Sequence, residues 1–232
     1  MNAKRGYVPD DEKNFSPEAV QKMRIASRQV FFLLNEGYDL KSASTFVGNH
    51  FLFSERQRLA ITRSLATDKQ LEQRKDRQKV SESFSRQEVW IDGFNTVITA
   101  EVMLSDSLLF LGMDGCIRDL AALRGTYRII PETAEVVRMI FGTLQTMKIQ
   151  KANILLDEPV SNSGRLKALI AEIGEEFAFE IDIQVLKDVD RTLYEKENVI
   201  SSDSIILDHC KSWINLMGEC LKQTGKTVLK VW

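Results

Sequence analysis

Histidine and cysteine are scarce in this 232-residue chain, and their scarcity argues against several kinds of site. The two histidines, His50 and His209, lie far apart in sequence, so a histidine-rich zinc site is not expected. The three cysteines, Cys116, Cys210 and Cys220, have no C-x-x-C spacing. They are typical of reduced thiols in a cytoplasmic protein.

Long hydrophobic runs are absent as well. No stretch approaches the ~18 apolar residues that a membrane-spanning helix needs, and residues 1–6 lack the apolar segment of a signal peptide. We therefore expect no membrane association and a cytoplasmic location. The chain has only 4 Pro and 12 Gly, which argues against long disordered stretches.

Several signature motifs of enzymes are missing. No G-x-G-x-x-G follows the first predicted strand, so a dinucleotide-binding domain lacks its fingerprint. The sequence contains no G-x-x-x-x-G-K-[ST] and no G-x-S-x-G, which argues against a P-loop NTPase and an α/β-hydrolase. Asp92 has no second acid two residues later, which argues against an aspartyl-phosphate phosphatase.

Charge is nearly balanced overall but unevenly distributed. The net charge of −2 argues against a polycation that binds nucleic acid by charge alone. Residues 1–89 carry 16 Lys and Arg against 12 Asp and Glu, whereas residues 90–232 carry 15 against 21. A basic first part fits an anionic polymer and an acidic second part fits a cation site; solvated surface explains both equally simply.

Residues 1–66 predict a small all-helical domain. Ser16-Pro17-Glu18 is typical of a helix start, and Gly37 of its end. A second helix is expected at 40–47 with Gly48 as its end, and Ser54-Glu55-Arg56-Gln57 predicts a capping box that opens a third. The apolar face of these helices is a core, a homodimer interface or part of a helix-turn-helix unit that reads DNA.

Residues 67–87 are almost wholly polar and predict a solvated helix or a linker. The segment is a spacer between domains or a basic rail for a nucleic-acid backbone. The rail would use four residues: Arg74, Lys75, Arg77 and Lys79.

Residues 88–232 alternate between strand-like and helix-like segments, which predicts a parallel sheet covered by helices. Short apolar runs predict strands at 89–91, 108–113, 153–156, 177–186, 199–202 and 227–232. Helices are expected at 96–104, 131–147, 165–175 and 204–222, with helical turns at 116–123. The predicted fold class is therefore α/β: a three-layer, mostly parallel sheet in 88–232 after a small helical N-terminal domain.

Four of the apolar runs end in an aspartate, namely Asp92, Asp114, Asp157 and Asp203. Carboxyl ends of parallel strands meet at one edge of a sheet, and neighbouring strands lie about 5 Å apart. We therefore expect these carboxylates to share a cleft, together with Asp188 or Asp190. Crowded carboxylates have raised pKa values or hold a divalent cation, and oxygen ligands without His or Cys favour Mg²⁺ or Mn²⁺.

Two of these strand ends resemble a known family. Asp92-Gly93-Phe94-Asn95 resembles the D-G-[YF]-N opening of the NYN branch of PIN-like nucleases, and Ile200-Ser201-Ser202-Asp203 resembles their later V-T-S-D strand end. The resemblance covers roughly residues 89–232. The whole chain also resembles an uncharacterised prokaryotic family in which a helical domain of unknown function is fused to a PIN-like domain. The resemblance implies a PIN-like, Rossmann-like fold and metal-dependent cleavage of RNA.

The resemblance also implies roles for individual residues. Asp92 and Asp203 would bind the metal, Asp157 would lie near the metal or the attacking water, and Asn95 would orient Asp92 or contact substrate. The remaining acid would be Asp114 or Asp119. Residues expected to bind substrate are Arg118, Ser202 and the loop of Ser161, Asn162 and Ser163 before a helix. Arg118 alternatively pairs with an acid, and the loop alternatively only caps its helix.

The leading functional hypothesis is a metal-dependent ribonuclease that acts on single-stranded or structured RNA. The first alternative is a non-catalytic nucleic-acid-binding or assembly module with the same fold. The second is a DNA-binding regulator that uses the N-terminal helices.

Overall fold

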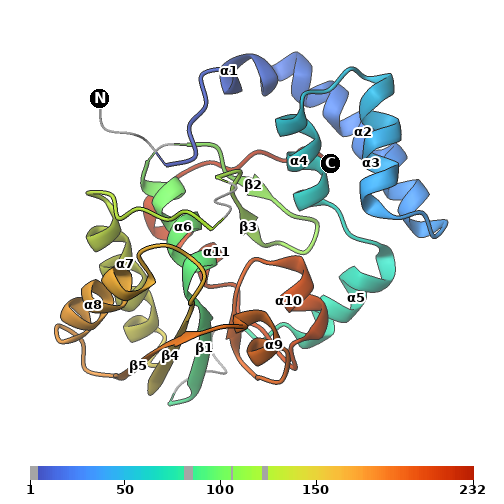
Figure 1. Cartoon of the computed structure of the whole chain (residues 1–232). Coiled ribbons are helices and arrows are strands. Elements are labelled where there is room, and N and C mark those ends of the chain that lie inside the picture. The colour runs from blue at the N-terminus through green and yellow to red at the C-terminus, as the bar shows by residue number, and fades with distance from the viewer. Residues whose placement is uncertain (1–4, 81–85, 106, 122–124) are drawn as a thin grey trace.

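The computed structural model describes residues 5–80, 86–105, 107–121 and 125–232 (Figure 1). Residues 81–85 of the expected linker and residues 122–123 of the expected helical turns lie outside this description. No helix in the described ranges is long and apolar enough to cross a membrane.

The N-terminal part is helical, as predicted. Its helices are α1 (Asp11–Asn14), α2 (Pro17–Asn35), α3 (Leu40–His50), α4 (Glu55–Ser64) and α5 (Asp68–Arg77). The Ser16 hydroxyl caps α2, and Ser54 and Gln57 form the expected capping box of α4. The predicted end of the second helix at Gly48 is wrong. Gly48 lies inside α3, where Arg58 packs so closely that a Cβ would be 3.0 Å from its side chain.

A four-stranded parallel sheet forms the centre of the second part. Its strands are β1 (Glu88–Asp92), β4 (Lys151–Asp157), β5 (Glu180–Leu186) and β6 (Val199–Ile200), in the order β5-β4-β1-β6. The chain passes from β1 to β4 and β5 in one direction and then returns to place β6 on the other side of β1. The strand order therefore reverses between β1 and β6, which is where open α/β sheets bind ligands.

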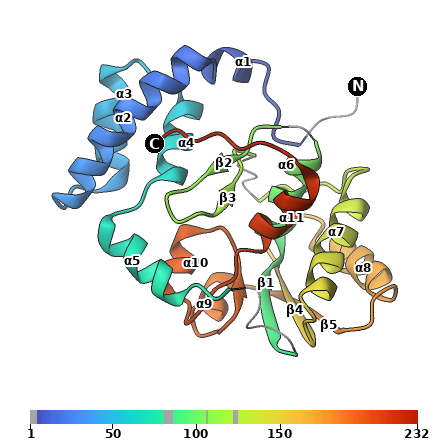
Figure 2. The same ribbon diagram turned by 180° about the vertical axis from the view of Figure 1, so that it is seen from behind.

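Helices cover both faces of this sheet, so the fold is α/β with three layers (Figure 1 and Figure 2). One face packs against α6 (Gly93–Leu104), α7 (Thr133–Thr146) and α8 (Ser163–Gly174), and α11 (Leu216–Thr224) packs on α6 and α7 in the same layer. The other packs against α9 (Val189–Tyr194) and α10 (Ser204–His209). Alternate strand residues serve the two layers: Ile154 and Leu156 face the first, and Leu155 faces the second.

The second apolar run does not join the parallel sheet, which corrects the prediction for 108–113. Residues Phe110–Leu111 form β2, which pairs in antiparallel fashion with β3 (Ile117–Arg118). The helical turns expected from residue 116 are replaced by β3. Asp114-Gly115 is thus a hairpin turn, with Gly115 at φ +79°, and not the end of a parallel strand.

Two predictions near the C-terminus are also wrong. The single helix expected at 204–222 is divided into α10 and α11, because Trp213 between them is fully buried and forms bridges to Gln78 and Val199. The segment 227–232 is not a strand: among the described residues it forms a single bridge, from Leu229 to Phe110.

The core of the helical part extends beyond the expected boundary at residue 66. Phe110, Leu120 and Val231 belong to the same buried cluster as α2, α3 and α4. In both views the C-terminus lies beside α4 (Figure 1 and Figure 2). The first and last parts of the chain are therefore packed together.

Candidate functional site

Carboxylates gather at the carboxyl end of the parallel sheet, on both sides of the point where the strand order reverses. Asp92 ends β1 and Asp157 ends β4, and these strands are neighbours. Asp203 follows β6 and caps α10, and Asp190 lies in the first turn of α9. We call these four residues, Asp92, Asp157, Asp190 and Asp203, the acidic edge.

Asp92 is the most buried member of the acidic edge, with 6% of the residue exposed. Burial is the main cause that raises the pKa of its carboxyl to about 7; the charges of Asp203 and Asp157 act in the same direction, and a hydrogen bond from Ser201 acts against them. That bond runs from the Ser201 hydroxyl to Asp92 Oδ2 over 2.8 Å. Asp92 therefore takes up a proton near neutral pH unless a cation compensates its charge.

The other members repel one another too. Burial raises the pKa of Asp157, with contributions from Asp190 and Asp188. Burial is also the largest cause that raises the pKa of Asp190, and the charge of Asp203 is the second. Within the described ranges, none of the four carboxylates of the acidic edge forms an ion pair with a Lys, Arg or His. Among the described residues, the negative charge of this edge is therefore not neutralised by direct ion pairs, although the charge of Arg118 acts on Asp203.

Asn95 and the serines after β6 connect the two strand ends. The Asn95 Oδ1 atom accepts hydrogen bonds from the backbone N–H of Ser202 over 2.8 Å and from its hydroxyl over 2.9 Å. The Ser201 hydroxyl accepts a bond from the backbone N–H of Asp203. Asn95 thus orients the segment that carries Asp203, and Ser202 serves this connection.

Asp114 lies apart from the acidic edge, which follows from its position in the hairpin turn. Both of its oxygens are bound by arginines: Oδ1 by Arg118 over 2.8 Å, and Oδ2 by Arg118 over 2.6 Å and Arg74 over 2.7 Å. Burial alone would raise the pKa of Asp114, but the two guanidinium groups lower it to about 2. Asp114 therefore pairs with two arginines, and its prediction as a metal ligand is wrong.

Arg118 and Asp119 also have internal partners. The Arg118 side chain is 7% exposed, and its Nε donates to the Ser202 carbonyl over 2.8 Å, so it faces the protein interior. Of the two predictions for Arg118, substrate binding or pairing with an acid, the structure shows the second, because Arg118 pairs with Asp114. Asp119 accepts a hydrogen bond from Thr99 over 2.7 Å and pairs with Arg63 on α4, away from the strand ends.

The loop of Ser161, Asn162 and Ser163 precedes α8, as expected, but its first two side chains bind backbone. Ser161 exchanges hydrogen bonds with the N–H and the carbonyl of Tyr127, and Asn162 donates to the same carbonyl over 2.6 Å. Asn162 makes no side-chain cap of α8 and has φ +63°. The loop therefore holds the Tyr127 segment against the sheet.

The polar segment at 67–87 contains α5, whose basic residues divide into two groups. Lys75 and Lys79 are exposed, as a basic rail requires. Arg74 is buried and pairs with Asp114 and Asp208, and Arg77 donates to the carbonyls of α10. Much of α5 is therefore attached to the second part of the protein and is no spacer.

The acidic edge has the donor set of a hard cation site. Within the described residues, no three His, Cys, Asp or Glu side chains stand close enough to hold a metal ion between them. Mg²⁺ is commonly held by one or two carboxylates and keeps several waters. In that mode of binding, Asp92 and Asp203 would be the ligands of the ion, with Asp157 beside them.

Ser201 is a site residue that the sequence reasoning missed, and Asp190 was only one of two alternatives there. Ser201 and Ser202 are neighbours in the strand-end motif, and neighbouring side chains of an extended segment point to opposite faces. This alternation was the signal from which a hydrogen bond between Ser201 and Asp92 could have been predicted. Only the position of α9 decides between Asp190 and Asp188, because Asp188 caps this helix and pairs with Arg191.

Comparisons with known proteins match two families described as of unknown function and an uncharacterised relative. A family model described as a domain of unknown function (DUF5616) matches residues 81–219, and one described as a protein of unknown function (DUF434) matches residues 22–77. The chain is 32% identical over 197 residues to "Uncharacterized protein MJ0935" of Methanocaldococcus jannaschii, covering 84% of this chain and 94% of that protein. No solved structure matches the chain.

Proposed function

The chain belongs to the family described as a domain of unknown function (DUF5616), and we propose that it is a metal-dependent ribonuclease with a PIN-like fold. Its catalytic centre would be the acidic edge. The observation that carries the proposal is a set of four carboxylates at the point where the strand order reverses, none of which forms an ion pair within the described residues. The choice of RNA as the substrate rests on the resemblance of the two strand-end motifs to PIN-like nucleases.

Each residue of the acidic edge has a role in this proposal. Asp92 and Asp203 would hold Mg²⁺ or Mn²⁺, and the ion would lower the pKa of a bound water and stabilise the leaving oxygen of a phosphodiester. Asp157 and Asp190 would lie beside the ion; burial raises the pKa of both carboxyls, and either carboxylate would accept a proton from the attacking water. Asn95 and Ser201 keep the two ligand-bearing strand ends in register.

The proposal is tested with the full chain and end-labelled RNA, single-stranded and structured, in Mn²⁺, in Mg²⁺ and in EDTA. Asp92→Asn keeps the shape of the side chain and removes its charge. We expect cleavage that requires the metal and falls at least about 100-fold in Asp92→Asn, because metal-ion catalysis contributes several kcal/mol.

The matched control is Asp76→Asn, which makes the same change at an exposed position on α5. Its cleavage rate should equal that of the wild type. Cleavage that persists in EDTA, or in Asp92→Asn, would remove the acidic edge from the reaction. Binding of RNA without any cleavage would favour the non-catalytic module.

A further inference from the structure

We propose that Arg74 of α5 and Arg118 of β3 are positioning residues that hold Asp203 in place by binding the peptide carbonyls on both sides of it. This inference rests on the proposed function, because it assigns Asp203 to the catalytic centre. It adds the helical N-terminal part to the machinery of the site. In this arrangement Asp114 is the shared anchor of both arginines.

The two carbonyls that flank Asp203 have separate arginine partners. Arg118 Nε donates to the Ser202 carbonyl over 2.8 Å, and Arg74 Nη2 donates to the Ser204 carbonyl over 3.3 Å. Within the described chain, the hydrogen bonds to the Asp203 carboxylate come from backbone N–H groups, those of Ile205 and Ile206, and both reach the same oxygen, Oδ1. The arginines therefore fix its backbone and leave its second carboxylate oxygen open.

Asp114 joins the two arginines into one unit. Its Oδ2 atom accepts from Arg118 over 2.6 Å and from Arg74 over 2.7 Å, and its Oδ1 atom accepts from the backbone N–H of Cys116. The hairpin turn between β2 and β3 thus places Asp114 where it binds both of the arginines that contact the segment around Asp203. Neither arginine can shift without losing a bond to this carboxylate.

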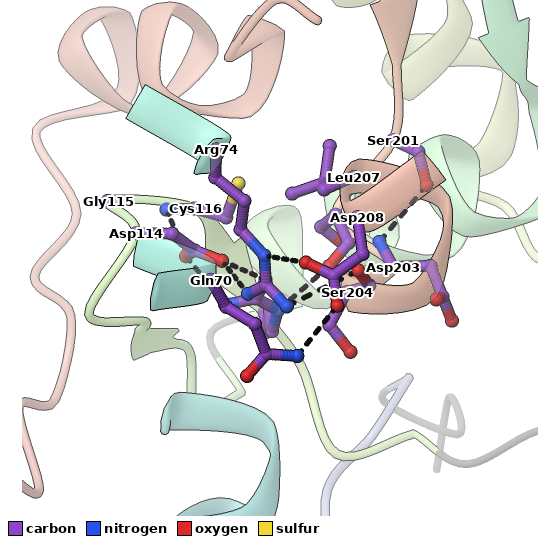
Figure 3. A network of polar contacts seen from close by, with 12 residues as sticks. Gln70, Arg74, Asp114, Gly115, Cys116, Ser201, Asp203, Ser204, Leu207 and Asp208 are labelled. Atoms are coloured by element: carbon purple, nitrogen blue, oxygen red, sulfur yellow. Dashed lines mark hydrogen bonds and ion pairs between the residues drawn. The ribbon is translucent and has the colours of Figure 1, made fainter. Parts of the chain in front are cut away.

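Arg74 also attaches α10, the helix that Asp203 caps. Its Nε donates to Asp208 over 2.6 Å, and Gln70, one turn earlier on α5, donates to the other oxygen of Asp208 over 2.8 Å. Figure 3 shows the guanidinium of Arg74 between Asp114 on one side and Asp208 on the other. Both ends of the short helix α10 are therefore tied to α5.

The network is buried and electrically balanced. The side chains of Arg74 and Asp114 are 3% and 1% exposed, and the two arginines face two aspartates, Asp114 and Asp208. Arg74 uses three N–H groups in three directions. A lysine ammonium is a single point on a flexible stem and cannot reproduce this fork. Arg74→Lys should thus keep the charge and release the Asp203 segment.

The experiment compares Arg74→Lys with Arg56→Lys in the full chain. Arg56 is the matched control: it also pairs with a carboxylate, Asp11, and donates to two backbone carbonyls, those of Leu120 and Gly6. In the part of the chain that the structure describes, its side chain forms no hydrogen bond or ion pair with the acidic edge. Three quantities are measured for each variant: amide hydrogen exchange of residues 201–206, affinity for Mn²⁺ by calorimetry, and kcat and KM for RNA cleavage.

We expect exchange of the 201–206 amides to rise at least about tenfold in Arg74→Lys and to stay unchanged in Arg56→Lys. Affinity for Mn²⁺ and kcat should fall about 10- to 100-fold in Arg74→Lys alone, as for other residues that orient metal ligands. Asp114→Asn, which keeps the shape of the anchor, should behave like Arg74→Lys. Equal exchange and equal Mn²⁺ affinity in Arg74→Lys and Arg56→Lys would overturn the proposal.

The proposed function can fail separately. If the wild type neither binds Mn²⁺ nor cleaves RNA, the nuclease is disproved, and the exchange rates alone decide whether the arginines position the Asp203 segment. Faster exchange confined to 201–206 in Arg74→Lys would then still support that positioning, and unchanged exchange would reject it.

Discussion

Asp92 combines burial with a charge, and these two properties oppose each other. The surrounding protein and the neighbouring carboxylates favour its neutral form, which is why its pKa rises from 3.8 to about 7. A cation at the acidic edge would favour the charged form instead. The residue therefore costs stability at neutral pH in the metal-free protein, and that cost should be measurable.

The sign of this effect is fixed by the two pKa values. Between about pH 4 and pH 7 the folded protein keeps the Asp92 proton that the unfolded chain has lost, so stability falls as the pH rises through this range. Above pH 7 the full cost is present, on the order of 4 kcal/mol for a shift from 3.8 to about 7. Asp92→Asn should be more stable than the wild type by up to this amount at pH 8, and equal to it near pH 4.

The measurement is urea denaturation of both proteins in EDTA from pH 4 to pH 8. Adding Mn²⁺ at pH 8 should stabilise the wild type and leave Asp92→Asn unchanged. A stability difference that does not vary with pH would show that burial and the neighbouring carboxylates do not raise the pKa of Asp92 as described.

At the scale of elements, the turn from β1 into α6 depends on a close approach of helix and sheet. Gly93 begins α6 directly after Asp92, and a Cβ there would lie 2.6 Å from a Leu156 methyl group and 2.8 Å from the Leu155 carbonyl. The carbonyl belongs to the sheet backbone and cannot move aside. The absence of a side chain at residue 93 thus lets α6 sit close behind the strand end that carries Asp92.

Gly93→Ala should therefore destabilise the protein by about 1–3 kcal/mol through overpacking. Gly142 on α7 has more space: apart from the helix's own backbone, no atom of the described residues lies within 4 Å of a Cβ at that position. Gly142→Ala should stabilise by about 0.5–1 kcal/mol, the difference in helix propensity. Guanidinium denaturation of both variants decides the matter; similar effects at the two positions would contradict the packing described at Gly93.

The elements themselves were predictable where a local signal and the fold agree. Runs such as Asn153–Leu156 carry their own strand signal, and Ser16 and Ser54 carry helix starts. The run at 108–113 carries the same strand signal, but nothing local says whether its partner is parallel or antiparallel. The split between α10 and α11 was hidden for a similar reason: Trp213 is held by β6 and α5, which are distant in sequence.

For the candidate site, the sequence predicts the residues at strand ends but not the partners that tertiary structure brings to them. Asp92, Asp157 and Asp203 follow strand ends, so their meeting follows from a parallel sheet. The partners of Asp114 could not be inferred, because Arg74 stands 40 residues away on an element that the sequence suggests to be solvated. Asp114 had the same local pattern as the true strand ends, and only the tertiary structure separates them.

At the scale of the whole molecule, the two parts of the chain share a core. Phe110 of β2 is fully buried among residues of the N-terminal helices, and its ring centroid lies 5.2 Å from that of Phe15. The network of Arg74 adds a second connection, through α5. These connections predict that the helical part and the sheet unfold together.

Phe110→Ala should lower the free energy of unfolding by about 3–5 kcal/mol and keep a single transition. Hydrogen exchange provides the readout, since amides of α2 and of β4 should both exchange faster by the same factor. The matched variant is Phe141→Ala in the core beneath the sheet, which should give the same pattern. Faster exchange limited to α2 in Phe110→Ala would show that the helical part unfolds on its own.

The place of Val231 in the core of the first helices affects how the chain folds as it is made. Arg24 of α2 donates to the carbonyl of Lys230 over 3.0 Å, and Val231 is fully buried beside α2, α3 and α4. Ribosomes synthesise ~5–20 residues per second, so these partners emerge on the order of ten seconds after the helices. During that time the nascent helices lack their C-terminal partner, so the apolar surface that Val231 covers is exposed to water.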